Sequence, residues 1–235
     1  MALNVHSTSA TENESLIIFD ESRKLNLDTE IRFHLASDLH EFAEALLCGA
    51  PPANNAFRAQ LLEEQGYHLR ITRDLKVAED YLRERYRTNP EARFGLVASS
   101  KDRDLEAFGI ANDYQSAKRV HYGPWYSDPE DAPGGYSCRH LRDVITEFGA
   151  QGLELDAVLL AWGTDFLRED GQWTNRKARG YMQKAMVKHP FQLRVNSYRV
   201  LLTRGRDGTI VYVPKLSELD GTYEYLRDSG FRSLG

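Results

Sequence analysis

Two short apolar runs constrain the fold of this chain more than any other feature of its sequence. FGLVASS at 94–100 and AVLLAWG at 157–163 are rich in Val, Leu and Ala, with little polar alternation. Runs of this kind are typical of strands buried on both faces in a parallel sheet. Because parallel neighbours need crossover connections, the two runs predict an α/β fold in which helices cover both faces of one mostly parallel sheet.

Other segments carry weaker versions of the same signals. Helices are predicted where apolar residues recur at three- and four-residue steps or where the chain returns between strands, and strands where apolar runs are compact. The predicted helices cover 36–48, 74–87, 139–147, 195–204 and 217–229. The further predicted strands cover 16–19, 67–71 and 209–214. Pro51 and Pro52 predict a break between elements.

The segment 111–138 interrupts the alternation of strands and helices. It combines clustered Gly and Pro with four Tyr and one Trp, which predicts a long ordered loop or loop-rich insertion rather than a plain linker. The first 15 residues are polar and predict a flexible leader. We therefore predict a leader over 1–24 and a single domain over 25–235.

The composition limits the location and the partners of the chain. It has no run of about 18 apolar residues and no secretory pattern, so we expect a cytoplasmic protein without a membrane span. Its formal net charge of -5 is unlike that of a dedicated nucleic-acid clamp, so any contact with nucleic acid would use a local patch. Cys48 and Cys138 have no second Cys or His at ligand spacing, and no metal site is predicted.

The motif GAQGLELDAVLLAWG at 149–163 places a turn and an acid directly before an apolar strand. This arrangement brings backbone amides and one carboxylate to a sheet edge, where a nucleotide could bind. The alternative is that Gly152 is an ordinary turn residue and Glu154 a solvated charge.

Two further motifs place an arginine at the end of an element. In NSYRVLLTRGRDG at 196–208, Arg204 follows a packed helix and could offer a bidentate fork to a phosphate, or could meet the last carbonyls of that helix. In LNLDTEIRFHLASDLHEFAEALL at 25–47, Arg32 lies between a short strand and an amphipathic helix, where a surface salt bridge is the alternative.

In this order and at these separations, the three motifs resemble motifs IV, V and VI of superfamily 1 helicases, and more closely the Schlafen group 3-like DNA/RNA helicase domain family. The resemblance covers nearly the whole chain from about residue 25. It implies a RecA-like three-layer sandwich that is the second of two RecA-like domains, with ATP between them and single-stranded DNA or RNA as a partner.

The resemblance also implies roles for individual residues. Arg32 would reach the γ-phosphate, and Arg204 would act as the arginine finger that stabilises charge on the transferring phosphoryl group. Glu154 would lie near the nucleotide sugar, with Gln151 and Gly152 giving the close approach beside it.

Nucleic-acid contacts are implied or suggested at other positions. Thr146 matches the motif V residue that contacts the single-strand backbone, whereas Phe148 departs from the polar residue of many relatives. Trp125 and its aromatic neighbours could stack bases, or could pack the insertion onto the domain. Arg176 and Lys177 begin a basic stretch that could follow phosphates or form a solvated helix face.

The sequence contains no G-x-x-x-x-G-K-[ST] motif, so the P-loop and the Mg²⁺ ligand would come from a first RecA-like domain. LIIFDES at 16–22 imitates a Walker B strand, but Asp20 and Arg32 are too close in sequence to hold the rest of such a domain. We interpret Asp20 and Glu21 as a solvated pair. The alternative function is a non-catalytic nucleic-acid-binding or interaction module that retains the RecA-like fold.

Overall fold

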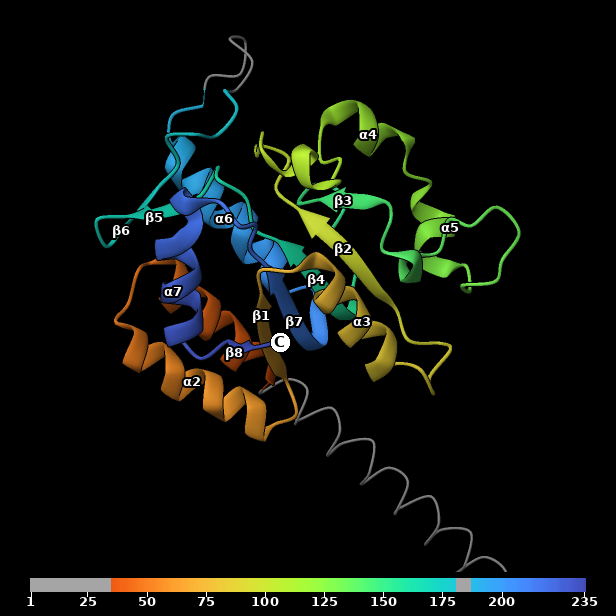
Figure 1. Cartoon of the computed structure of the whole chain (residues 1–235), viewed down its shortest axis with the longest axis horizontal. Helices are drawn as coiled ribbons and strands as arrows, with labels where there is room; N and C mark the ends of the chain where they lie inside the picture. The colour runs from red at the N-terminus through yellow and green to blue at the C-terminus, as the bar shows by residue number, and fades with distance from the viewer. Residues whose placement is uncertain (1–34, 181–186) are drawn as a thin grey trace, which may run out of the picture. The chain divides into compact units, whose positions relative to one another are not determined.

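A parallel β-sheet forms the centre of the structure, a computed structural model that describes residues 35–180 and 187–235 (Figure 1). Within these residues the sheet has six strands in the order β3-β2-β4-β7-β1-β8, and every neighbouring pair is parallel. The strands are β1 (His68–Thr72), β2 (Phe94–Ala98), β3 (Val144–Thr146), β4 (Leu155–Ala161), β7 (Gly205–Tyr212) and β8 (Arg232–Ser233). The predicted α/β fold is confirmed.

Helices cover both faces of this sheet. They are a helix that extends to residue 47, α2 (Pro52–Glu64), α3 (Leu75–Arg85), α6 (Pro190–Leu202) and α7 (Asp220–Asp228). Leu159 of β4 belongs to the core cluster that contains Leu82 of α3. On the other face, Val158 pairs in register with Thr209, whose hydroxyl donates to a carbonyl of α6 at 3.0 Å. From residue 38 onward, the chain therefore forms a RecA-like three-layer sandwich.

The segment between β2 and β3 is the predicted loop-rich insertion. It contains the short helices α4 (Tyr114–Arg119) and α5 (Tyr122–Ser127), drawn in green beside β3 in Figure 1. Trp125 anchors the insertion, because its ring is 1% exposed and lies against Gly95 of β2. A Cβ at Gly95 would come within 2.6 Å of that ring, so the contact requires glycine.

Most predicted elements are confirmed with small shifts of their ends. The exceptions begin with the helix predicted over 139–147, which is wrong: a 3₁₀ turn (Cys138–His140) is followed there by β3. The three residues of β3 are Val, Ile and Thr, all β-branched, and such side chains fit a strand better than a helix.

Several elements were missed, among them α2, a hairpin after β4, and β8. Pro51 and Pro52 were expected to mark a break, but Pro52 is the first residue of α2. Proline suits this position because the first helical residue needs no N–H donor. The polar stretch after β4 contains a hairpin of β5 (Leu167–Glu169) and β6 (Gln172–Thr174). Asp170 and Gly171 join its strands with φ of 48° and 76°, as a two-residue hairpin turn requires.

Some predictions fall outside the described residues. These are the leader over 1–24, the strand over 16–19, the Asp20–Glu21 pair and Arg32. In the described part of the chain, no helix is long and apolar enough to cross a membrane. Over the same ranges, no group of three or more His, Cys, Asp or Glu side chains is arranged to hold a metal ion.

Candidate functional site

Glu154 and Arg204 lie together where β4 and β7 begin. Each residue immediately precedes its strand, and the two strands are parallel neighbours. The N–H of Leu155 donates to the carbonyl of Arg204 at 2.9 Å, which fixes the two chain segments side by side. The parallel register thus brings two of the predicted nucleotide-binding residues to one edge of the sheet, which we call the amino edge.

The Arg204 guanidinium is partly buried and bonded to neutral groups. Its Nε donates to the Val200 carbonyl at 3.1 Å, and longer bonds of 3.5 and 3.4 Å reach the Leu153 carbonyl and the Thr203 hydroxyl. Burial lowers the pKa of Arg204, and the nearby Glu154 carboxylate acts in the opposite direction. Since Arg204 forms no ion pair with a described carboxylate, its charge remains available to an anion.

Gln151 and Gly152 form the turn that leads into β4. Gly152 has a φ of 80°, a conformation that glycine adopts without strain, and nothing lies within 4 Å of the position of a Cβ there. Gln151, Gly152 and Glu154 are all exposed. An outside ligand can therefore approach the backbone of this turn and the Glu154 carboxylate from solvent.

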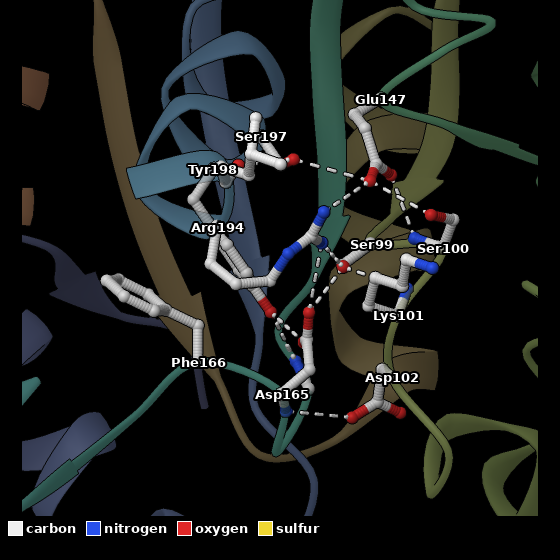
Figure 2. Close-up of polar contacts among 12 residues, drawn as sticks. Ser99, Ser100, Lys101, Asp102, Glu147, Asp165, Phe166, Arg194, Ser197 and Tyr198 are labelled. Atoms are coloured by element: carbon white, nitrogen blue, oxygen red, sulfur yellow. Dashed lines mark hydrogen bonds and ion pairs between the residues drawn. The ribbon is translucent and has the colours of Figure 1, made fainter. Parts of the chain in front are cut away.

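A buried ionic network occupies the opposite, carboxyl edge of the sheet (Figure 2). Arg194 of α6 bonds to Glu147 at 3.1 Å, to Asp165 at 3.3 Å and to the Ser99 hydroxyl at 2.7 Å. Its partners follow β3, β4 and β2 respectively. Tyr198, one turn further along α6, donates to Asp165 at 2.7 Å. We call these five residues the Arg194 network.

Glu147 is the member of the network that follows β3. Its side chain accepts from the N–H and the hydroxyl of Ser100, at 2.8 and 2.9 Å, and from the Ser197 hydroxyl at 3.3 Å, in addition to Arg194. The residue is 3% exposed. Both carboxylate oxygens are therefore held, and the backbone where β3 ends is fixed to β2 and α6.

Asp165 carries a raised pKa within this network. Complete burial raises the pKa of its carboxyl to about 6, against hydrogen bonds from Ser99 and Tyr198, which lower it. One cation, Arg194, serves both Glu147 and Asp165. The nearby Asp102 carboxylate adds to the rise of the Asp165 pKa, because a like charge disfavours ionisation, while the Arg194 cation acts in the opposite direction.

We predict that Asp165 makes stability depend on pH. Its ordinary pKa is near 3.9, so the folded protein binds this proton more tightly, and the resulting stabilisation is lost as the pH rises through about 6. Relative to Asp165→Asn, the free energy of unfolding of the natural protein should fall by roughly 2 kcal/mol between about pH 4.5 and pH 7, measured by urea unfolding. A difference that stays constant with pH would contradict this origin.

The four residues predicted to contact nucleic acid differ in their exposure to solvent. Thr146 ends β3 with 2% exposure, so its hydroxyl lies below the surface. The buried Trp125 ring donates from Nε1 to a carbonyl at 3.3 Å and has no free face for a base. Arg176 and Lys177 lie near the surface and pair with Glu169 and Glu218. Thr146 ends its strand, and Arg176 and Lys177 pair with Glu169 and Glu218, so these three residues are not part of the amino edge. Trp125 lies next to that edge, because Gly95 adjoins both its ring and Leu155, and the hydroxyl of the neighbouring Tyr126 donates to the Glu154 carbonyl at 2.9 Å.

A comparison with known protein families gives a match. A family model described as Schlafen group 3, DNA/RNA helicase domain covers residues 5–215. The chain belongs to this family. In this Schlafen group 3 helicase domain, the match spans both the amino edge and the Arg194 network. No match was found among curated proteins or among solved structures.

Sequence reasoning missed the Arg194 network altogether. Its members come from three strand ends and one helix, so no short motif contains them. One signal was present: Ser99 and Asp165 follow neighbouring apolar runs, and the carboxyl ends of parallel strands meet at one edge. That rule predicts the meeting of these two residues, but not the arginine that joins them.

Proposed function

We propose that this domain is the C-terminal, second RecA-like half of a cytoplasmic, superfamily 1 type, ATP-dependent DNA/RNA helicase or translocase. The observation that carries the proposal is the meeting of Glu154 and Arg204 at the amino edge. The helicase family of the chain supports it. A first RecA-like domain, in the same protein or another chain, would supply the P-loop and hold Mg²⁺.

The groups at the amino edge suit ATP by their chemistry. An exposed carboxylate such as Glu154 can accept hydrogen bonds from sugar hydroxyls, and the exposed turn at Gln151 and Gly152 permits close approach. The Arg204 guanidinium offers donors of fixed geometry to phosphate oxygens. When bound, ATP supplies the phosphoryl group whose transfer to water drives movement.

Each residue of the chain would then have a defined task. Arg204 stabilises negative charge that develops on the phosphoryl group, and its attachment to α6 holds it in place for that purpose. Arg32, outside the described residues, would add a second cation. On the nucleic-acid side, Arg176 and Lys177 would exchange their surface carboxylates for phosphates. The Thr146 hydroxyl, implied by the resemblance as a strand contact, is only 2% exposed and does not support that role.

A non-catalytic nucleic-acid-binding or interaction module is the second candidate. The observation that favours it is the lack of a P-loop motif in the sequence. The two candidates differ in one respect, because only the motor half needs Arg204 for hydrolysis.

The experiment that tests the proposal compares Arg204→Ala with Arg206→Ala in a protein that joins this chain to a P-loop domain. Arg206 lies two residues further on, is exposed and pairs with Asp156. Loss of nucleic-acid-stimulated ATP hydrolysis in the first variant alone supports the motor half. If Arg204→Ala and Arg206→Ala hydrolyse ATP at the same rate in the presence of nucleic acid, the result supports the non-catalytic module.

A further inference from the structure

The insertion between β2 and β3 contacts the amino edge through a side chain of α5. The hydroxyl of Tyr126 donates to the backbone carbonyl of Glu154 at 2.9 Å, across a separation of 28 residues in the sequence. Tyr126 belongs to α5, whereas Glu154 immediately precedes β4. The bond therefore attaches the insertion to the residue that would meet the nucleotide sugar.

The peptide group between Glu154 and Leu155 is held at both of its polar atoms. Its carbonyl accepts from Tyr126, and its N–H donates to the carbonyl of Arg204 at 2.9 Å. Because a peptide group is planar, fixing its two ends fixes the orientation of the chain there. One rigid group thus connects the insertion, the proposed sugar contact and the proposed arginine finger.

Tyr126 is itself fixed by its neighbours. The guanidinium of Arg93, the residue before β2, lies 4.7 Å from the centre of the Tyr126 ring, and its Nε donates to the Tyr126 carbonyl at 3.1 Å. The preceding residue, Trp125, is 1% exposed and packs on Gly95 of β2. A donor that is already ordered in this way loses little conformational entropy when it holds the backbone of Glu154.

The turn before Glu154 gives it little support. Gln151 and Gly152 are exposed, and nothing lies within 4 Å of the position of a Cβ at Gly152. Since glycine adopts more backbone conformations than other residues, this side of Glu154 is the less constrained one. The Tyr126 bond compensates for that freedom, because a binding group displaced by about 1 Å loses much of its interaction with a bound ligand.

We propose that Tyr126 is a positioning residue of the ATP site, which holds Glu154 where its carboxylate accepts hydrogen bonds from the sugar hydroxyls of a ribonucleoside triphosphate. The inference rests on the proposed function, since it assigns a support to a residue of that site. Tyr126 acts on the binding of the nucleotide sugar, whereas Arg204 acts on the transferring phosphoryl group, so the two residues affect different kinetic constants.

The first test measures hydrolysis of ATP, 2′-deoxy-ATP and 3′-deoxy-ATP by a protein that joins this chain to a P-loop domain. Tyr126→Phe removes only the hydroxyl. It should raise KM for ATP roughly 2- to 12-fold and leave the turnover number within about twofold. KM should rise less for the deoxy substrate that lacks the hydroxyl bound by Glu154, because the variant has already weakened that contact.

Tyr223→Phe is the matched control. Tyr223 also lies beside a guanidinium, that of Arg73 at 5.3 Å, and its hydroxyl bonds to the Ser233 hydroxyl at 3.5 Å, but it belongs to α7. This variant should change neither KM nor the preference for ATP. Equal KM values for Tyr126→Phe and Tyr223→Phe would overturn the proposal. A rise in KM that is the same for all three substrates would overturn it as well.

Amide hydrogen exchange of the 235-residue chain tests the contact without a nucleotide. Exchange at the Leu155 N–H should be roughly 2- to 12-fold faster in Tyr126→Phe than in Tyr223→Phe. Equal exchange rates in the two variants would show that Tyr126 does not hold this peptide group, and would overturn the proposal. The motor claim fails separately, because it is overturned by full ATP hydrolysis in Arg204→Ala.

Discussion

Replacing Arg204 by alanine is expected to reduce nucleic-acid-stimulated ATP hydrolysis by about 10³- to 10⁵-fold in a protein that joins this chain to a P-loop domain. The size of the effect follows from the role of an arginine finger, which stabilises charge present mainly in the transition state. Arg204 suits that role because it is partly buried, attached to the last turn of α6 and without an ion-pair partner in the described residues. The measurement is the turnover number at saturating ATP and oligonucleotide.

Two further variants separate catalysis from folding. Arg206→Ala removes a neighbouring exposed guanidinium. The rate of ATP hydrolysis should stay within about twofold of that of the natural protein, because the surface ion pair of Arg206 with Asp156 contributes little free energy. Arg204→Lys keeps the charge but loses the planar fork and should restore only part of the activity. Thermal unfolding of Arg204→Ala should show a folded domain. Full ATP hydrolysis by Arg204→Ala would show that Arg204 is not an arginine finger.

Replacing Arg194 by alanine is expected to lower the free energy of unfolding by about 3–5 kcal/mol. The arginine is 2% exposed and is shared by Glu147 and Asp165, which are 3% and 0% exposed. Its loss would leave two buried carboxyl groups without their cation. The change is measured by urea unfolding at about pH 7, where Asp165 is mostly ionised.

A second site distinguishes the network from a general effect of removing an arginine. Arg58→Ala removes a surface partner of Glu41 and should cost less than about 1 kcal/mol. Combining Arg194→Met with Glu147→Gln and Asp165→Asn removes all three charges and should recover much of the loss, because the uncompensated charge is the source of the penalty. A loss as small as that of Arg58→Ala would show that the network contributes little to stability.

The layers of the fold could be predicted because strands that are buried on both faces consist mainly of apolar residues. The strand β2 is apolar throughout, and β4 is apolar apart from Asp156 near its start, since both faces of each strand are covered. The amino edge could also be anticipated, because Glu154 and Arg204 lie shortly before the strands predicted over 157–163 and 209–214, and parallel register aligns the starts of neighbouring strands. Their meeting is a consequence of topology rather than of a contact that only coordinates reveal.

Local signals were available for the elements that were missed. Proline at the first position of a helix accounts for α2, and an Asp-Gly turn accounts for the hairpin of β5 and β6. The three β-branched residues of β3 outweigh the helical expectation over 139–147.

The burial of individual side chains could not be predicted. Trp125 and Phe148 are both aromatic residues near the insertion, yet one is 1% and the other 67% exposed. The difference arises because Trp125 of α5 packs onto Gly95 of β2, a contact between separate parts of the sequence. Arg194 was likewise indistinguishable from the exposed arginines around it until α6 was placed against three strand ends.

The most direct test of the motor-half account is ATP hydrolysis by the purified 235-residue chain, with and without single-stranded DNA or RNA, repeated after a P-loop domain is joined to it. The account predicts no turnover by the chain alone, and nucleic-acid-stimulated turnover that Arg204→Ala abolishes once the P-loop domain is present. Turnover by the chain alone that Arg204→Ala removes would contradict it, because the chain would then build a complete ATP site by itself.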